Sequence, residues 1–125
     1  MWNSGEKYEG AYLGTEMDEL WWKRYKKDKI FARGNGKFWF DEMGIYFHRY
    51  LTRRPLYIPF NQMRSFKIGQ WHAGRWAMHI PILKIIWYKD NQKLSSGFAL
   101  TKKRRELAKL LEIFQQKTSA VFENV

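Results

Sequence analysis

The sequence predicts a mainly β domain, a barrel or roll of six or seven antiparallel strands capped by one C-terminal α-helix. Three observations support this fold class. Short segments between residues 30 and 100 alternate apolar and polar side chains, as half-buried strands do. Aromatic residues make up 18% of the chain, and they favour strands. Residues 101–116 instead place apolar side chains at i, i+3, i+4 and i+7, which makes one stripe on a helix.

Length and composition fit one ordinary domain. The chain has 125 residues, of which 45% are hydrophobic, so it can bury a core. It has no cysteine, which excludes disulfides and thiolate metal sites. No apolar run approaches the roughly 20 residues that span a bilayer. The first residues lack a basic region followed by an apolar one, so we expect no secretory signal and a cytoplasmic protein.

Residues 1–29 are expected to form an N-terminal arm outside the main domain. Residues 1–14 contain three glycines and show no periodicity, which favours an irregular segment. Thr15 followed by acidic residues is typical of a helix start, so a short helix is expected from there. Trp21 and Trp22 either cover one end of the core or anchor the arm at a lipid interface; the nearby acids favour the first interpretation.

The main domain is expected at residues 30–118, followed by a tail at 119–125 that docks loosely or frays. Its strands are expected at residues 30–40, 44–50, 56–60, 63–71, 82–88 and 94–100. Gly34-Asn35-Gly36 predicts a bulge or bend, and Pro59 predicts an edge strand. Asp90-Asn91 predicts a hairpin turn, residues 72–81 a long loop, and Thr101 the helix cap.

We expect the inward-facing positions of these strands and of the helix to meet in one core. Its predicted members are Phe38, Phe40, Ile45, Phe47, Ile58, Phe66, Ile68, Leu83, Ile85, Phe98, Leu107, Leu110, Leu111 and Phe114.

The order of these elements resembles a known superfold. The likeness is carried by Gly34–Phe40, Asp41–Gly44, Ile45–Phe47, Leu56–Phe60, Met63–Phe66, Leu83–Trp87, Ser96–Phe98 and the closing helix, over about residues 30 to 117. These segments resemble the pleckstrin-homology-like (PH-like) superfold, and within it the small bacterial PH and GRAM-type domains. The resemblance implies a non-catalytic binding module for a protein partner or a lipid surface.

Positive charge is concentrated in the last two thirds of the chain. Residues 1–42 carry eight basic and eight acidic residues, whereas residues 43–125 carry the whole net charge of +11. Residues 43–89 contain eight cations and no acid. Such a surface attracts nucleic acid, anionic lipid or an acidic protein, although a merely soluble basic protein has the same composition.

Seven cations are candidates for anion binding. Four of them occupy the expected first helical turn, where cations oppose the helix dipole and free N–H groups bind anions. A solvated surface run is the alternative interpretation. PH domains that bind phosphoinositides carry a Lys…basic-x-Arg motif, to which Lys37 and Arg49 would correspond, but Leu51 stands where its last arginine is needed. The candidates are Arg49, Arg53, Arg54, Lys102, Lys103, Arg104 and Arg105.

A second candidate surface is aromatic. Trp71 and Trp76 flank Arg75 between two expected strands. At least one of the two tryptophans is expected to seal the open end of the sheet opposite the helix. An exposed Trp71 or Trp76, with Arg75, is expected to form a partner-binding edge, because tryptophan and arginine dominate interface hot spots. Interleaved aromatic and basic residues such as Tyr46, Arg49 and Tyr50 could also stack bases, although any half-exposed strand with tyrosines looks the same.

Catalysis is not expected. The sequence has no phosphate-binding glycine loop, no G-x-S-x-G and no H-E-x-x-H motif. His48, His72 and His79 lack an acidic neighbour in sequence, so we expect them at the surface or in loops. The sequence therefore predicts a binding module without cofactor or metal, acting on a protein or an anionic membrane surface, with nucleic acid as the alternative. Lipid binding would place it at the membrane periphery; the oligomeric state stays open.

Overall fold

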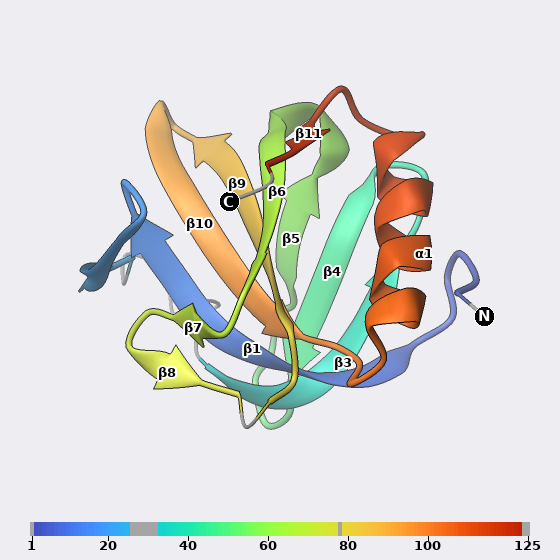
Figure 1. Ribbon diagram of the computed structural model, residues 1–125, viewed down its shortest axis with the longest axis horizontal. Coiled ribbons are helices and arrows are strands. Elements are labelled where there is room, and N and C mark those ends of the chain that lie inside the picture. Colours follow the sequence, from blue (N-terminus) through green and yellow to red (C-terminus); the bar gives the residue numbers. More distant parts are fainter. Residues whose placement is uncertain (1, 26–32, 78, 124–125) are drawn as a thin grey trace.

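A single curved sheet forms most of the molecule, and one helix packs across its open side (Figure 1). The computed structural model describes residues 2–25, 33–77 and 79–123. The strands in these residues are β1 (Tyr8–Met17), β2 (Leu20–Arg24), β3 (Gly34–Phe40), β4 (Gly44–Arg49), β5 (Leu56–Pro59), β6 (Met63–Gly69), β7 (Trp71–His72), β8 (Arg75–Trp76), β9 (Ile82–Lys89), β10 (Gln92–Ala99) and β11 (Val121–Phe122). The helices are the 3-10 turn η2 (Phe60–Gln62) and α1 (Arg104–Gln115).

The strand order confirms the mainly β prediction. The main sheet runs β11-β6-β9-β10-β1-β3-β4-β5, with β2 paired to β1 beside this path and β7–β8 as a separate hairpin. Neighbouring strands are antiparallel except β11, which runs parallel to β6. β5 lies at one end of the order, as Pro59 predicted for a residue with no N–H to donate.

The expectation of an irregular arm and a helix before residue 30 is wrong. Residues 8–17 form β1, which lies in the middle of the sheet between β10 and β3, so a domain boundary at residue 30 would remove a central strand. Gly10 and Gly14 suggested a loop, but each serves the strand. A side chain at Gly10 would come within 2.9 Å of Leu100 Cδ2, and Gly14 lies at a register shift with φ +110°.

The acidic residues after Thr15 form a turn and not a first helical turn. Asp18 and Glu19 both have positive φ, and they join β1 to β2 as a hairpin. Two consecutive left-handed residues are incompatible with a right-handed helix, so Thr15 is a strand residue and not a cap.

The glycines at the start of β3 also act differently from the prediction. β3 pairs with β1 and β4 without a register shift, so Gly34–Gly36 contains no bulge. A Cβ at Gly36 would overlap the carbonyl oxygen of His48 on β4. Gly36 therefore permits a close approach of two strands. The expected start of this strand at residues 30–32 lies outside the described residues.

One core lies between the sheet and α1. Thirteen of the fourteen predicted members are buried in it, and Ile68 packs against it half-buried. Phe114 occupies its centre, where its ring contacts those of Phe38, Phe40, Phe60 and Phe66 at centroid distances of 5.6–6.3 Å. The stripe predicted on the helix is buried as expected, so α1 closes the sheet.

α1 begins two residues later than predicted. Its N-cap is Lys103, which makes no side-chain capping bond, and the Thr101 hydroxyl accepts the Lys103 N–H at 3.1 Å instead. Lys102 and Lys103 therefore precede the helix, and only Arg104 and Arg105 lie in its first turn. The tail does not fray directly after the helix, because β11 pairs with β6.

Candidate functional site

The predicted cations gather at one end of the molecule. Arg49, Arg53 and Arg54 lie on or beside the β4–β5 connection, and the other four lie where β10 leads into α1; both connections are at the bottom of Figure 1. A groove of about 450 Å³ lies between them, lined by Tyr50 on one wall and Lys102 on the other. Of the seven predicted cations, Lys102 lines this groove and Lys103 lines an adjoining hollow. We call the seven residues on the two connections the cationic rim: Arg49, Arg53, Arg54, Lys102, Lys103, Arg104 and Arg105.

The rim cations are available to a ligand. Six of them are exposed and Arg49 is half-buried, and none forms an ion pair with a carboxylate in the part of the chain that the structure describes. Ion pairs occur elsewhere, on Lys37, Lys67, Lys93, Lys109 and Lys117. Arg49 lies along Gly34, where a Cβ would be 2.7 Å from its Nε.

Leu51 stands out on the β4–β5 connection. Its relative exposure is 101%, so the side chain projects fully into water, and its φ of +69° is unfavourable for leucine. Hydrogen bonds fix the connection on both sides of it: the Tyr50 N–H donates to Asn35 O at 3.0 Å, and the Thr52 hydroxyl donates to Arg49 O at 2.6 Å. The strained backbone and the full exposure together make Leu51 a candidate for a binding role.

Sequence patterns alone did not predict a binding role for Leu51, which only breaks the phosphoinositide motif. The signal was present, because a leucine at that position follows the outward-facing Tyr50 and lies in the turn before Arg53 and Arg54.

The groove itself is less positive than the cationic rim. Glu9 lines it and accepts hydrogen bonds from the Tyr50 hydroxyl at 3.2 Å and from Lys37 Nζ at 3.5 Å. A second hollow of about 460 Å³ adjoins it, lined by Trp2, Lys103 and Glu106 among others. The arrangement therefore suits an extended anionic surface that contacts the rim better than a single anion held deep in the groove.

The structure describes only the backbone of the second predicted site, Trp71, Arg75 and Trp76. β7 and β8 form a short hairpin in which Trp71 pairs with Trp76 and His72 with Arg75, where a long loop was expected. The side chains of the three residues lie outside what the structure describes, so their partner-binding role stays a prediction.

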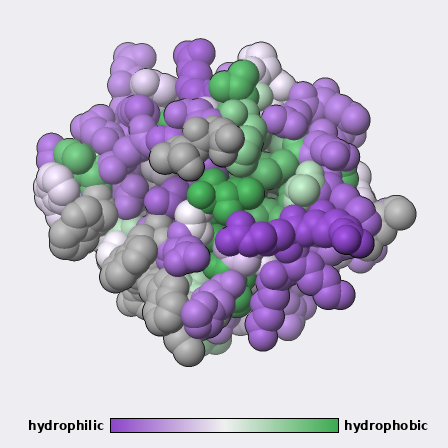
Figure 2. Space-filling view, in the orientation of Figure 1, coloured by the Kyte–Doolittle hydropathy of each residue, from purple (hydrophilic) through white to green (hydrophobic). Residues whose placement is uncertain are grey.

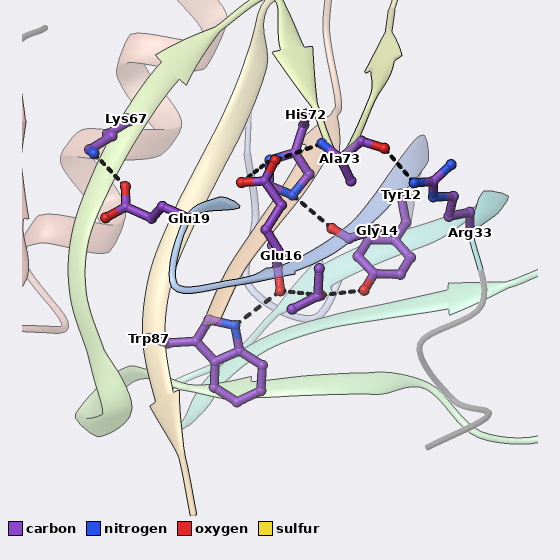
Figure 3. A network of polar contacts seen from close by, with 11 residues as sticks. Tyr12, Gly14, Glu16, Glu19, Arg33, Lys67, His72, Ala73 and Trp87 are labelled. Atoms are coloured by element: carbon purple, nitrogen blue, oxygen red, sulfur yellow. Dashed lines mark hydrogen bonds and ion pairs between the residues drawn. The ribbon is translucent and has the colours of Figure 1, made fainter. Parts of the chain in front are cut away.

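The expectation that His72 lies at the surface is wrong. It is 1% exposed, its Nε2 donates to Gly14 O at 2.9 Å, and a side chain at Gly97 would overlap its ring (Figure 3). Its Nδ1 is 3.8 Å from Glu16 Oε1, while Glu16 Oε2 accepts the Ala73 N–H at 2.8 Å. Burial, with Lys84 next, lowers the His72 pKa from 6.5 to about 4, so the ring is neutral at pH 7 and does not pair as an ion with Glu16.

A hydroxyl chain lies beside this cluster inside the sheet. Thr15 Oγ1 bonds the Tyr12 hydroxyl on one side and Ser96 Oγ at 2.7 Å on the other, and Trp87 Nε1 donates to Ser96 Oγ at 3.0 Å. These groups are buried and bonded to one another, which is the behaviour of a structural network. Among the described residues, no three His, Cys, Asp or Glu side chains gather in a way that could hold a metal ion.

Comparison with protein families shows a likeness over most of the chain. A family model described as "Bacterial PH domain-like" matches residues 3–114, which includes β1 and every element to the end of the buried helix face. No curated protein and no solved structure matches the chain. Among the described residues, no helix is long and apolar enough to cross a membrane.

Proposed function

Because the chain belongs to the bacterial PH domain-like family, whose domains generally act as binding modules, we propose that it binds the surface of an anionic lipid bilayer. The cationic rim contacts the headgroups, and Leu51 inserts between them. The observation that carries the proposal is the fully exposed leucine in a fixed turn among unpaired cations.

The two contributions act together. A cation near an anionic bilayer contributes about 1 kcal/mol, so several rim residues are needed for stable attachment. Burying a leucine side chain in the acyl boundary contributes about 1.5–3 kcal/mol more. In the sequence, Leu51 lies between Arg49 and the pair Arg53 and Arg54, which supply part of the rim charge. The expected attachment is reversible and depends on salt.

Nucleic acid is less well supported than lipid. The outward aromatic side chains of β3, β4 and β5 stack on one another: Trp39 on Tyr46 at 5.2 Å and Tyr46 on Tyr57 at 4.8 Å between centroids. Lys7 covers the Trp39 ring at 4.7 Å. These ring faces are occupied within the protein, so they offer little area for base stacking.

The test is binding to vesicles of phosphatidylcholine with 30% phosphatidylserine, compared with phosphatidylcholine alone, at low salt. We expect the wild-type protein to sediment only with the anionic vesicles. The double variant R53E/R54E should lose at least tenfold in affinity. R64E controls for charge per substitution, because Arg64 is an exposed cation at the start of β6 that lies over the Tyr88 ring and outside the rim. It should lose much less than half of the binding free energy that R53E/R54E loses.

Three results would decide against the proposal. Wild-type protein that ignores anionic vesicles at low salt contradicts lipid binding. A loss of binding free energy in R64E that is half of the loss in R53E/R54E would mean that net charge alone governs attachment, because each Arg-to-Glu change removes the same charge. Failure on vesicles together with tight binding to an acidic protein, lost in R53E/R54E, would assign the rim to a protein partner.

A further inference from the structure

The C-terminal segment lies along β6 as a very short added strand. Val121 and Phe122 pair in parallel with Ser65 and Phe66, and the Glu123 N–H donates to Phe66 O at 2.8 Å. The chain is anchored just before this point, where Ala120 is buried in the core and the Thr118 hydroxyl donates to Phe60 O at 2.8 Å. These contacts fix the chain just before it reaches the edge of β6.

Neither apolar side chain of this pairing is fully buried. Val121 is 61% exposed and Phe122 is 40% exposed, so Val121 lies mostly in water and Phe122 is only partly covered. Glu123 also forms an ion pair of 3.7 Å with Lys67. A two-residue ladder with incompletely buried side chains opens at low free energy, so this edge can exchange its occupant.

β11 pairs with only part of the β6 edge. On the side that β11 occupies, the described residues supply no strand partner for Lys67–Gly69. Figure 2 shows an apolar region that runs from β11 down between β6 and α1, with hydrophilic surface on both sides. Ile68 on β6 and Ile113 on α1 are half-buried against the core. An open strand edge beside an apolar strip is the arrangement to which extended peptides add as a further strand.

We propose that the edge of β6 is a binding site for an extended segment of a partner protein that takes the place of Val121–Glu123. The in-chain occupant shows the chemistry of the ligand: two apolar residues followed by an acidic one, in parallel with β6. Lys67 selects the acid, because it already binds two carboxylates, those of Glu19 and Glu123. The site does not involve the cationic rim, so this inference does not rest on lipid binding.

The experiment uses the full chain and a labelled peptide, Ser-Ala-Val-Phe-Glu-Asn-Val, that copies the tail. The variant E123P removes the N–H that bonds to Phe66 O, and F122D removes the apolar side chain at an exposed position; each should release the tail without disturbing the core. We expect both variants to bind the peptide at least tenfold more tightly than wild-type protein does. Fluorescence anisotropy measures the affinities.

Controls locate the site. A peptide with Glu replaced by Lys should bind the released protein at least fivefold more weakly. In the E123P background, K67Q should weaken binding of the original peptide, whereas K93Q should not, because Lys93 pairs with Glu19 at 2.6 Å but forms no ion pair with Glu123. No binding to either released variant overturns the proposal, as does equal binding to released and wild-type protein. Binding that is indifferent to the Glu-to-Lys peptide and to K67Q overturns it too.

Discussion

Polar groups are exposed to water along the first half of β1 and buried along its second half. Its first half borders the surface groove, where Glu9 and the cationic rim face water and no rim cation pairs with a described carboxylate. Its second half, from Tyr12 to Glu16, crosses the buried cluster, where hydroxyl, carboxylate and imidazole groups bond to one another. An exposed charge without a partner costs folding little and is free for a ligand, whereas a buried polar group must be satisfied inside the protein. Stability should therefore depend on the second half and binding on the first.

The largest effect is expected in the interior. Leu111→Ala removes a buried side chain from the core face of α1 and should lower the free energy of unfolding by about 2–5 kcal/mol. Urea denaturation measures it. A loss below about 1 kcal/mol would mean that the helix does not close the sheet.

The buried cluster should make stability depend on pH. The folded-state pKa of His72 is about 4 against 6.5 for an ordinary histidine, so the unfolded chain binds more protons between these values. Stability is complete above pH 6.5 and falls as the pH drops towards 4, by roughly 3 kcal/mol in total. Glu16, Lys84 and Arg33 also face this region, so the comparison must be with a variant.

The measurement is the free energy of unfolding at pH 7.5, 5.5 and 4.5 in wild-type protein, H72Q and H79Q. H72Q should be less stable at pH 7.5 and should lose less stability on acidification. H79Q should follow the wild-type protein, because His79 is exposed. An unchanged slope in H72Q would remove the distinction between the two halves of β1.

At the rim, replacing Leu51 should raise the stability of the protein and weaken its binding to vesicles. Leu51→Asn places a residue that tolerates a left-handed backbone at φ +69°, so it should raise the free energy of unfolding by up to about 1 kcal/mol. The same variant should bind anionic vesicles roughly tenfold more weakly, since the inserted side chain is lost. A variant that gains stability and keeps full vesicle binding would show that Leu51 does not insert.

The smallest effect on stability is expected at the start of α1. Lys103 and Arg104 lie at the positive end of the helix dipole, so K103E/R104E should leave the melting temperature unchanged or slightly raised. Sedimentation with anionic vesicles should nevertheless be abolished. A stability loss comparable with that of Leu111→Ala would mean that these cations are structural.

Local rules of strand and turn chemistry predicted much of the fold. Pro59 marked an edge strand, and Asp90 and Asn91 adopt the positive φ angles of a tight hairpin turn. β1 was missed because Gly10 and Gly14 look like loop residues until Leu100 and β10 are in place beside them. A close approach depends on a partner far along the chain, which local patterns do not contain.

Sequence patterns predicted the cations of the candidate site but not its exposed leucine, and the binding role of both stays a prediction. The excess of cations in the last two thirds of the chain marked all seven rim residues, because charge is visible in composition. Leu51 and His72 could not be assigned in the same way: exposure and burial are properties of the folded chain, and Leu51 is exposed while His72 is buried. The role of Trp71, Arg75 and Trp76 remains a prediction.

The central position of β1 also governs how the molecule must assemble. Ala11 pairs with Ala99, and the Trp2 indole donates to Glu106 O at 2.7 Å, so the first described residues depend on late partners as well as on β3. β1 is synthesised before β10 and must wait for it before that edge is covered. Contacts this distant in sequence are associated with slow folding, on the scale of milliseconds to seconds. During that interval, one edge of β1 stays unpaired and is accessible to a chaperone.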